Sequence, residues 1–230
     1  MKISIIIPAY NEEQNLRKLL PWLQKHGADS VSEVVVVDGG SNDKTVEIAE
    51  QFEAVALLSP KKGRAAQMNF GAKHASSEIL YFLHADTFPP ENFADLILTS
   101  IKENSVAGSF KLSFDDDHPL LKLYASFTSM RSILFRFGDQ SLFVKQNIFE
   151  QSGGYYENLI VMEDQEIFRR LKNFGRLGII KTPVITSSAK YRKNGVIRLQ
   201  FIFTIIFLLY YAGVSQKTLV HIYKKLIRTE

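Results

Sequence analysis

The first half of the chain alternates strand-like and helix-like segments, and this alternation constrains the fold more than any other sequence feature. Apolar runs rich in β-branched residues occupy 2–10, 32–40, 54–59 and 78–86. Segments with helical patterns follow each run, at 11–26, 41–52, 63–75 and 89–104. Strands joined through helices lie parallel in one sheet. We therefore predict an α/β fold with a Rossmann-like, mostly parallel central sheet flanked by helices.

The starts of these helices carry recognisable signals. Asn11 is expected to cap the first helix and Ser41 or Asn42 to begin the second, because their side-chain oxygens accept hydrogen bonds from free backbone N–H groups. Pro89 and Pro90 are expected in the first turn of the fourth helix, where the missing N–H leaves no bond unmade.

Composition limits the classes of function. Of the 230 residues, 46% are hydrophobic and 23% are charged, so we expect one substantial core in one domain, or in a domain with an appendage. The absence of cysteine excludes disulfides, zinc–thiolate sites and thiol nucleophiles. A net charge of +4 allows anionic ligands or a membrane surface, and we expect no nucleic-acid partner. The strand-like run begins at Lys2, so we expect no signal peptide and a cytoplasmic location.

Polar motifs follow three of the predicted strands. The first strand ends on "PAYNE", the second on "DGGSND" and the fourth on "HAD". Ligands of such sheets bind beyond the carboxyl ends of the strands, so the three motifs are expected to form one site. Neither a dinucleotide-binding glycine motif nor a P-loop is present, so we do not expect a glycine-rich loop that binds a phosphate group. If the fourth strand runs through "HAD", His84 and Asp86 lie on one face and either hold a metal or close the strand.

The ordered set of motifs resembles the family 2 glycosyltransferases with the GT-A fold, over residues 1 to 195. The matching segments are "SIIIPAYNE", "VVVVDGGSND", "GRAAQMNFGA", "HAD" and "GGYYENLIVMEDQEIFRRLKNFG". The chain looks most like the small, free-standing subgroup that carries GRxxQMN and HAD, with "GDQSLFVK" further on. This resemblance implies a nucleotide-diphosphate sugar as donor.

The resemblance implies a divalent metal, Mn²⁺ or Mg²⁺, at "HAD". Asp86 matches the last carboxylate of the family's DxD triplet, and His84 replaces the first, which is a departure from the family pattern. A carboxylate and a neutral imidazole still suit these ions, whose other ligands are diphosphate oxygens and water. Alternatively, Asp86 only caps the following helix and His84 is a buried hydrogen-bonding residue.

The resemblance also implies which residues contact the donor nucleotide. Asp38 corresponds to the residue that binds the base, and Glu12 to an acidic residue near the ribose. The pocket would be lined by the backbone of Pro8, Ala9 and Tyr10. The alternatives are that Asp38 only fixes the following turn and that Glu12 only favours a helix start.

Two arginines are candidates for the donor phosphates. Arg64 lies near the start of a helix, where a cation gains nothing from the helix dipole, so a phosphate ligand explains it better than surface solvation does. Arg192 is expected to reach the diphosphate from a mobile loop that orders over the nucleotide, with a solvated basic loop as the alternative. Processive family members carry QxxRW in this region, and this chain has Lys190, Tyr191 and Arg192 instead, which disfavours polymer synthesis.

The acceptor side is expected in the second half. Asp139 and Gln140 precede an apolar strand, while Glu163 and Asp164 begin an amphipathic helix. The resemblance makes Asp164 the candidate base of a single inverting displacement, with Glu163 supporting it. Alternatively, both carboxylates only stabilise the helix N-terminus.

The segment 196–213 is more apolar than the rest of the chain. Its core is the 14 residues Leu199–Ala212, fewer than the ~20 needed to span a bilayer. A helix packed on the catalytic domain, an interfacial helix at the inner face of the membrane and a homodimer contact all remain open. A short basic amphipathic helix follows at 215–230, so we predict a GT-A domain over 1–195 and a helical appendage over 196–230.

These observations lead to the hypothesis of a metal-dependent, inverting, non-processive hexosyltransferase. We expect a nucleotide-sugar donor, with a family-level preference for uridine, and an acceptor that is unidentified and could be lipid-linked. Two alternatives are a nucleotidyltransferase that acts on a sugar phosphate and a nucleotide-sugar-binding module that has lost turnover. Only His84 favours the second alternative. Asp115, Asp116 and Asp117 belong to no motif.

Overall fold

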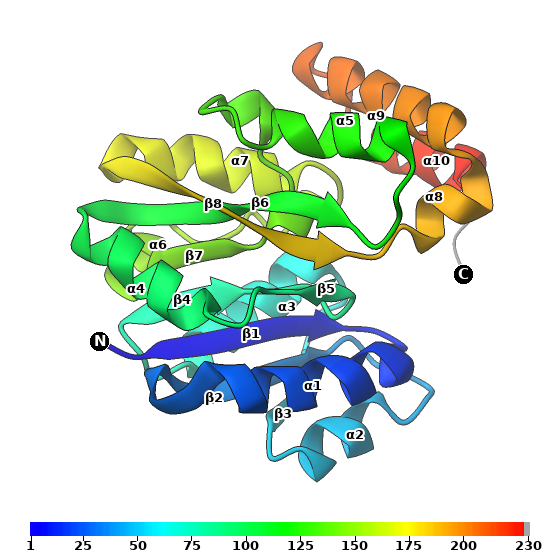
Figure 1. Ribbon diagram of the computed structural model, residues 1–230. Coiled ribbons are helices and arrows are strands. Elements are labelled where there is room, and N and C mark those ends of the chain that lie inside the picture. The colour runs from blue at the N-terminus through cyan, green and yellow to red at the C-terminus, as the bar shows by residue number, and fades with distance from the viewer. Residues whose placement is uncertain (228–230) are drawn as a thin grey trace.

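The computed structural model describes residues 1–227, apart from the side chain of Ala28. One eight-stranded sheet runs through the molecule in the order β3-β2-β1-β4-β7-β6-β8-β5 (Figure 1). The strands are β1 Ile3–Ala9, β2 Val31–Asp38, β3 Val55–Leu58, β4 Ile79–Phe82, β5 Thr87–Phe88, β6 Ser105–Phe114, β7 Leu142–Lys145 and β8 Arg176–Thr186. Strands β1 to β4 are parallel to one another, as their connecting helices predicted.

Helices cover both faces of the sheet. They are α1 Glu13–Gly27, α2 Thr45–Gln51, α3 Arg64–His74, α4 Phe93–Lys102, α5 Pro119–Phe127, α6 Gln146–Gln151, α7 Glu163–Leu171, α8 Ala189–Asn194, α9 Val196–Tyr211 and α10 Gln216–Leu226. Short 3₁₀ helices are η1 Ala28–Ser30, η2 Ile133–Phe135, η3 Gly138–Gln140 and η4 Lys172–Phe174. This three-layer arrangement confirms the predicted fold class.

Alternation along the strands divides the core in two. Ile5 of β1 packs in one cluster with α1, α2 and α4, and its neighbour Ile6 packs in the other with α3, α6 and α7. Successive side chains of a strand point to opposite faces, and both faces are covered here, so the central strands are apolar at nearly every position. This burial explains why the runs at 2–10 and 32–40 could be recognised as strands.

The second half of the sheet departs from simple alternation. β7 inserts between β4 and β6 and is antiparallel to both, whereas β6 and β8 are parallel to each other. β5 pairs with β8 in the antiparallel sense at the sheet edge. These pairings bring the segment around Asp139, which precedes β7, next to the turn that follows β4.

Several predicted helix starts are wrong. Asn11 has a φ of 56°, and Glu12 supplies the backbone oxygen that accepts from Asn15 and Leu16 at the start of α1. The second helix begins only at Thr45, where Asp43 accepts from the Thr45 N–H. In both places the loop side chains form contacts between β1 and β2 instead. Asn11 Oδ1, for example, accepts from the Asn42 N–H at 2.8 Å.

The fourth strand and fourth helix also differ from expectation. β4 ends at Phe82, so His84 and Asp86 lie in the turn before β5 rather than on one strand face. That turn is closed by the Thr87 N–H, which bonds to the His84 carbonyl at 3.1 Å. The two prolines at 89 and 90 precede α4, which begins at Phe93.

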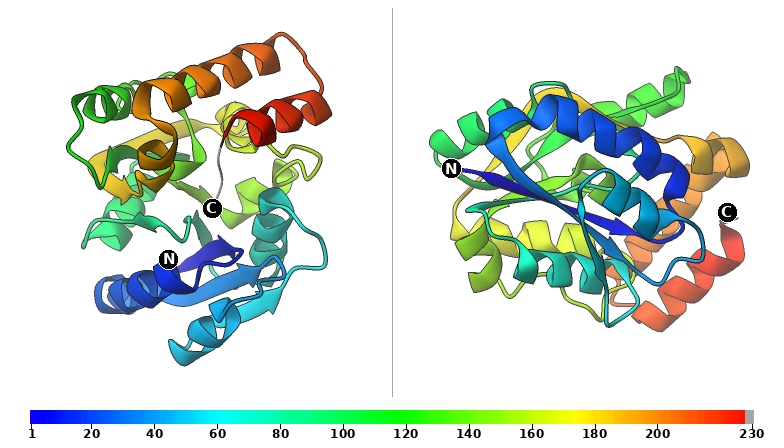
Figure 2. Two further views of the ribbon diagram at one scale, coloured as in Figure 1. Left: turned by 90° about the vertical axis from the view of Figure 1, so that its right-hand side faces the viewer. Right: turned by 90° about the horizontal axis from the view of Figure 1, so that it is seen from below.

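One side of α9 packs against α8, α10 and α5. Leu199, Ile202 and Ile206 form a small separate core with Ile227. Figure 2 shows α5 and α9 beside each other, far from α1 and α2. No helix within residues 1–227 is long and apolar enough to cross a membrane. The predicted helix at 215–230 corresponds to α10 with Ser215 as its cap, and residues 228–230 lie outside the described part of the chain.

Candidate functional site

Five side chains from four separate segments form a charged cluster beside the carboxyl end of β4. Arg64 begins α3, His84 follows β4, Asp139 lies in η3, and Glu163 and Asp164 begin α7. Arg64 Nη2 lies 2.6 Å from Glu163 Oε1, and Arg64 Nη1 lies 3.3 Å from His84 Nε2. His84 Nδ1 lies 3.3 Å from Asp139 Oδ1. The sheet therefore brings together charges predicted for both the donor and the acceptor.

The ion pair between Arg64 and Glu163 lies at the centre of this charged cluster. Only 2% of the Glu163 side chain is exposed, and burial raises its pKa above the ordinary value while Arg64 opposes that rise. Burial would lower the pKa of Arg64, but Glu163, Asp164 and Asp139 outweigh it and raise that pKa. A cation surrounded by three carboxylates remains charged and can also face an anionic ligand.

The contact between His84 and Asp139 shifts the pKa of both side chains. Burial lowers the pKa of His84, but the hydrogen bond to Asp139 together with the negative charges of Asp139 and Asp164 outweighs it, so the net pKa is raised. Burial raises the pKa of Asp139, but the same hydrogen bond and the positive charges nearby lower it to about 2. Because the Arg64 guanidinium can only donate, its contact requires Nε2 of His84 to accept, which leaves the imidazole proton on Nδ1 facing Asp139.

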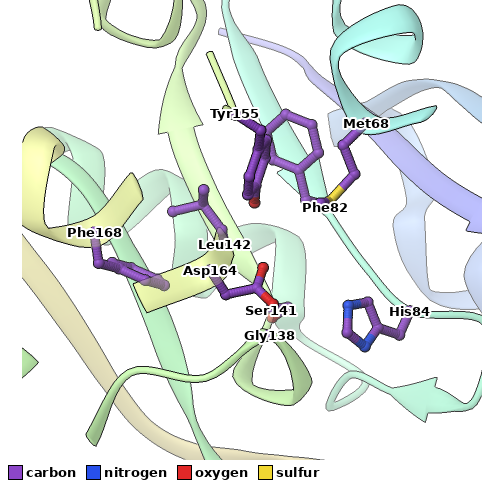
Figure 3. A pocket seen from close by; sticks show the side chains of 9 residues that line it. All are labelled: Met68, Phe82, His84, Gly138, Ser141, Leu142, Tyr155, Asp164 and Phe168. Atoms are coloured by element: carbon purple, nitrogen blue, oxygen red, sulfur yellow. The ribbon is translucent and has the colours of Figure 1, made fainter. Parts of the chain in front are cut away.

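Asp164 lies against the backbone of Gly138. A Cβ atom on Gly138 would lie 2.2 Å from Asp164 Oδ2 and 2.9 Å from His84 Cε1. Figure 3 shows Asp164, Gly138, His84 and Tyr155 lining one narrow pocket, together with Met68, Phe82, Ser141, Leu142 and Phe168. Glycine at 138 is thus required for the close approach of the η3 backbone to the candidate base.

The backbone before α7 is strained. Met162, which immediately precedes Glu163, has a φ of 69° in the left-handed region and provides no side-chain cap. Such a conformation is unfavourable for a residue with a Cβ and is found preferentially at functional sites. Here it turns the chain so that Glu163 and Asp164 enter the charged cluster at the helix N-terminus, where anions are stabilised.

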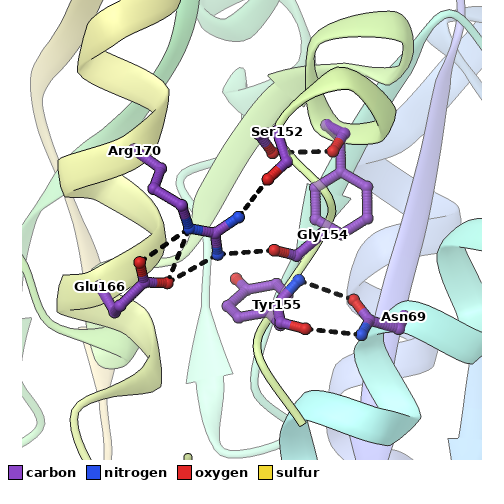
Figure 4. Close-up of polar contacts among 7 residues, drawn as sticks. Asn69, Ser152, Gly154, Tyr155, Glu166 and Arg170 are labelled. Carbon is purple, nitrogen blue, oxygen red and sulfur yellow. Dashed lines mark hydrogen bonds and ion pairs between the residues drawn. The ribbon is translucent and has the colours of Figure 1, made fainter.

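The motif GRAAQMN connects three parts of the site. Gln67 donates through Nε2 to the carbonyls of Ala9 and Val37, at 2.8 Å each, and so joins the ends of β1 and β2. Asn69 donates to the Tyr155 carbonyl and accepts from the Tyr155 N–H, both at 2.8 Å (Figure 4). With Arg64 bound to Glu163, this helix contacts both the strand ends predicted for the donor and a carboxylate predicted for the acceptor.

A second set of contacts in Figure 4 fixes the turn that carries Tyr155. Arg170 forms an ion pair with Glu166 one helical turn earlier, with Nη2 at 2.6 Å from Oε2. The same guanidinium donates to the carbonyls of Ser152 and Gly154. Both charged side chains are thereby satisfied within the protein, and the turn is attached to α7.

The predicted nucleotide-side residues lie at the ends of β1 and β2. Asp38 is buried, and its Oδ2 accepts from the backbone N–H groups of Gly40 and Ser41 at 2.9 and 3.0 Å. Asp38 therefore at least fixes the turn after β2. Glu12 accepts from Asn15 Nδ2 at 2.6 Å, beside the start of α1. In the segment Pro8, Ala9 and Tyr10, the side chain of Tyr10 is exposed, whereas Ala9 is buried and Pro8 is half-buried.

Asp86 lies in the turn between β4 and β5, close to the charged cluster. Its backbone carbonyl accepts from the Ser187 N–H at 3.2 Å, which connects this turn to the segment after β8. Burial raises the pKa of Asp86, and the negative charge of Asp139 raises it further, while His84 and Lys190 act against this rise. Asp86, Asp139 and Lys190 thus lie near enough to influence one another.

Two predicted site residues are bonded to other parts of the chain. Gln140 is fully buried, and its Oε1 accepts from Arg136 Nη1 at 2.6 Å. Arg192 lies in the helix α8 rather than in a loop, with Nη1 3.3 Å from Asp115 Oδ1 and 3.7 Å from Asp116 Oδ2. These ion pairs also give two carboxylates of the 115–117 triplet a structural role.

Comparison with known proteins identifies the family of the chain. Residues 4–156 match the sequence profile of Glycosyl transferase family 2. The chain belongs to this family. Glycosyltransferase AglE of Haloferax volcanii is 31% identical over 188 residues, which cover 75% of this chain and 62% of AglE. The chain thus spans less than two thirds of that relative.

Solved glycosyltransferase structures share the fold. S. aureus TarS, in a complex with UDP-GlcNAc, aligns with a TM-score of 0.69 and 20% identity, over 81% of this chain and 58% of TarS. Mannosyltransferase PcManGT from Pyrobaculum calidifontis, in a complex with GDP-Man and Mn²⁺, aligns with a TM-score of 0.67 and 20% identity, over 92% of this chain and 64% of PcManGT. At this identity the likeness establishes the fold of the family 2 chain and not its donor.

The Mn²⁺ of the PcManGT complex raises the question of which residues of this family 2 chain suit a divalent cation. Within residues 1–227, no three His, Asp or Glu side chains gather in a way that could hold a metal ion alone. His84 is a poor ligand, because its two ring nitrogens already face Arg64 and Asp139. Asp86 fits better: a cation would relieve the repulsion from Asp139 and take its remaining ligands from diphosphate and water.

Sequence reasoning missed three residues of this candidate site. Gly138 contacts Asp164, Tyr155 is buried with its pKa raised well above the ordinary value by burial and by the charge of Asp164, and Lys190 influences Asp86 and Asp139. The glycine of "FGDQ" and the tyrosines of "GGYY" were visible signals. Lys190 carried no signal, because only the packing of α8 brings it near Asp86.

Proposed function

We propose that this chain transfers a sugar from a nucleotide-diphosphate donor to an acceptor hydroxyl in a metal-dependent, inverting and non-processive reaction. The observation that carries the proposal is the charged cluster, which combines a cationic Arg64 with the candidate base Asp164 beside the turn of Asp86. Family membership supports sugar transfer, and the nucleotide sugars bound by the structural neighbours support this donor class. We include a cytoplasmic location and the division at residue 195 in the proposal.

The roles follow from where charge develops. Asp164 accepts the proton of the acceptor hydroxyl as that oxygen bonds to the anomeric carbon, and the bond from this carbon to the diphosphate breaks with its electron pair on the leaving oxygen. Attack opposite the leaving group inverts the anomeric centre. Arg64 faces the negative charge that develops on the diphosphate, and Glu163 holds the guanidinium in place.

A divalent cation bound by Asp86 would neutralise the leaving diphosphate. Asp139 is the acidic neighbour best placed to assist Asp86, because its negative charge raises the Asp86 pKa. Lys190 adds a second positive charge to Arg64 on this side. Asp38 and Glu12, with the backbone at the end of β1, are the proposed contacts of the nucleoside.

The proposal is tested first by calorimetric titration of UDP, GDP, ADP, CMP and dTDP, with Mn²⁺ and with a chelator. We expect one diphosphate to bind selectively and only with metal, with UDP favoured, and we expect Asp86→Ala to lose this binding. Asp117→Ala is the control, because that carboxylate is exposed and pairs only with Lys122. Metal-independent binding, or equal effects of both substitutions, would contradict the assigned role of Asp86.

Turnover separates the transferase from a module that only binds nucleotide sugar. Asp164→Asn keeps the shape of the side chain beside Gly138 but removes the base. We expect this variant to bind the selected diphosphate like the wild type and to lose donor cleavage. If the wild type bound nucleotide sugars but cleaved none of them, the binding module would replace the transferase as the best-supported function. Pyrophosphate release from a nucleoside triphosphate and a sugar phosphate would instead identify a nucleotidyltransferase.

A further inference from the structure

The outward side of α9 is apolar. Ile197, Phe201, Thr204, Leu208 and Tyr211 are exposed and recur every three or four residues, which places them on one stripe of the helix. Phe201 is 65% exposed and Leu208 is 59% exposed. The opposite stripe is buried against α8, α10 and Val161. A helix that is apolar on all sides is normally covered on all sides, and the outer stripe of α9 is uncovered within residues 1–227.

Neighbouring segments extend this stripe into a wider apolar face. α5 packs against α9 and exposes Leu123 and Phe127 one helical turn apart. The loop after α5 exposes Leu134. Gln165 joins the parts, since its Nε2 donates to the Leu134 carbonyl at 2.8 Å and its Oε1 accepts from the Tyr211 hydroxyl at 3.0 Å. We call Leu123, Phe127, Leu134, Phe201, Leu208 and Tyr211 the apolar face.

The charged side chains of α8 to α10, beside the apolar face, are all cationic, whereas Asp117 before α5 is exposed and pairs with Lys122. Residues 189–227, which form α8 to α10, contain no Asp or Glu and, apart from Lys190 near Asp86 and Asp139, six exposed cationic side chains. These are Arg192, Lys193, Arg198, Lys217, Lys224 and Lys225. Arg192 pairs with Asp115 and Asp116 from outside this segment. The partner that fits this part of the molecule therefore has an anionic surface, which attracts the cationic side chains, and an apolar layer, which accepts the exposed apolar ones.

The charge also distinguishes between two occupants. A symmetric dimer through α9 would bring the same cationic segment of both copies together, and like charges across an interface are unfavourable. A bilayer with anionic lipids would neutralise these charges and accept Phe201 and Leu208 among its acyl chains.

We propose that the apolar face docks on an anionic membrane surface and that the chain is a peripheral membrane protein. The docked side is continuous with the catalytic site, because the loop that exposes Leu134 runs into Gly138, which contacts Asp164. Docking would therefore hold the acceptor side of the site close to the lipid, which suits a lipid-linked acceptor. The surface itself does not depend on the proposed transfer reaction.

The test is sedimentation of the full chain with vesicles of phosphatidylcholine alone and with vesicles that also contain phosphatidylglycerol. We expect binding to the anionic vesicles that weakens with salt, as screened charge attraction requires. Phe201→Gln/Leu208→Gln should bind about tenfold more weakly or worse, since two apolar anchors become polar. Leu58→Gln is the control, because Leu58 is 69% exposed on β3 and is not part of the apolar face. Unchanged thermal unfolding verifies that the variants fold.

Three results would overturn the proposal. The first is no binding to either vesicle, and the second is an equal loss of binding in the Leu58→Gln control. The third is a dimer in analytical ultracentrifugation that Phe201→Gln/Leu208→Gln dissociates, which would assign the apolar face to a second copy. Metal-dependent nucleotide binding by the same variants is measured separately, so failure of docking and failure of the proposed function are distinguishable.

Discussion

Substitution of Gly138 by alanine tests the geometry of the candidate base directly. The new Cβ would lie 2.2 Å from Asp164 Oδ2, 2.7 Å from Asp164 Cγ and 2.9 Å from His84 Cε1. Non-bonded heavy atoms are attracted at about 3.5–4.0 Å and repel strongly at these shorter distances. Either the carboxylate or the η3 backbone must therefore move by about 1 Å.

Such a displacement has two expected effects. A misplacement of about 1 Å reduces turnover about 100-fold where the reacting groups must be aligned, so we expect kcat to fall by about this factor. Overpacking by one methyl group costs about 1–3 kcal/mol in the free energy of unfolding. Affinity for the nucleoside diphosphate should remain within about twofold, since Gly138 lies on the acceptor side of the site.

The assay is release of nucleoside diphosphate from the donor that the titrations select, together with urea unfolding. Gly71→Ala is the matched control, because its Cβ would lie 2.6 Å from Ile6 Cγ2 and 2.8 Å from Val37 Cγ2 in the core. This control should lose similar stability without the 100-fold loss of kcat. A Gly138→Ala variant with wild-type kcat would refute the assignment of Asp164 as a precisely positioned base.

Two further predictions concern stability. Gln67→Leu removes the amide that donates to the buried carbonyls at the ends of β1 and β2, so urea unfolding should show a free energy of unfolding lower by about 1–3 kcal/mol. A decrease below about 0.5 kcal/mol would contradict a stabilising role of these two hydrogen bonds. Burial raises the pKa of Glu33, but hydrogen bonds from Ser4 and Ser76 outweigh it and lower the pKa below 4.5. A depressed folded-state pKa stabilises the protein above the unfolded value, so the thermal stability advantage of wild type over Glu33→Gln should be full above about pH 5 and shrink as pH falls; a pH-independent difference would contradict this.

Local sequence patterns were sufficient for the identity and order of the elements in the first half. Runs such as 32–40 are apolar because both faces of β2 are covered, and this burial is itself what makes such a run readable. The two carboxylates at the start of α7, Glu163 and Asp164, were also predictable, because they begin a helical pattern in the sequence. Helix starts were less reliable: Asn11 and Ser41 bond across the β1 and β2 loops rather than to their own helices.

For the site residues, the sequence predicted several identities but not their contacts. Arg64 was predicted for its unusual place at a helix start, but its partner Glu163 lies 99 residues away and became known only from the fold. Gln140 and Arg192 were predicted from their neighbours in the sequence, and only the fold shows that they contact Arg136 and Asp115.

By itself, the sequence determined the α/β class, the order of the first strands and the family motifs, because these depend on residue types repeated within short segments. Only the tertiary structure decided that β7 enters between β4 and β6, that His84 lies in a turn between Arg64 and Asp139, and that Gly138 contacts Asp164. The physical reason is that such contacts join side chains from distant segments. Their distances depend on strand order and packing, and neither leaves a local pattern in the chain.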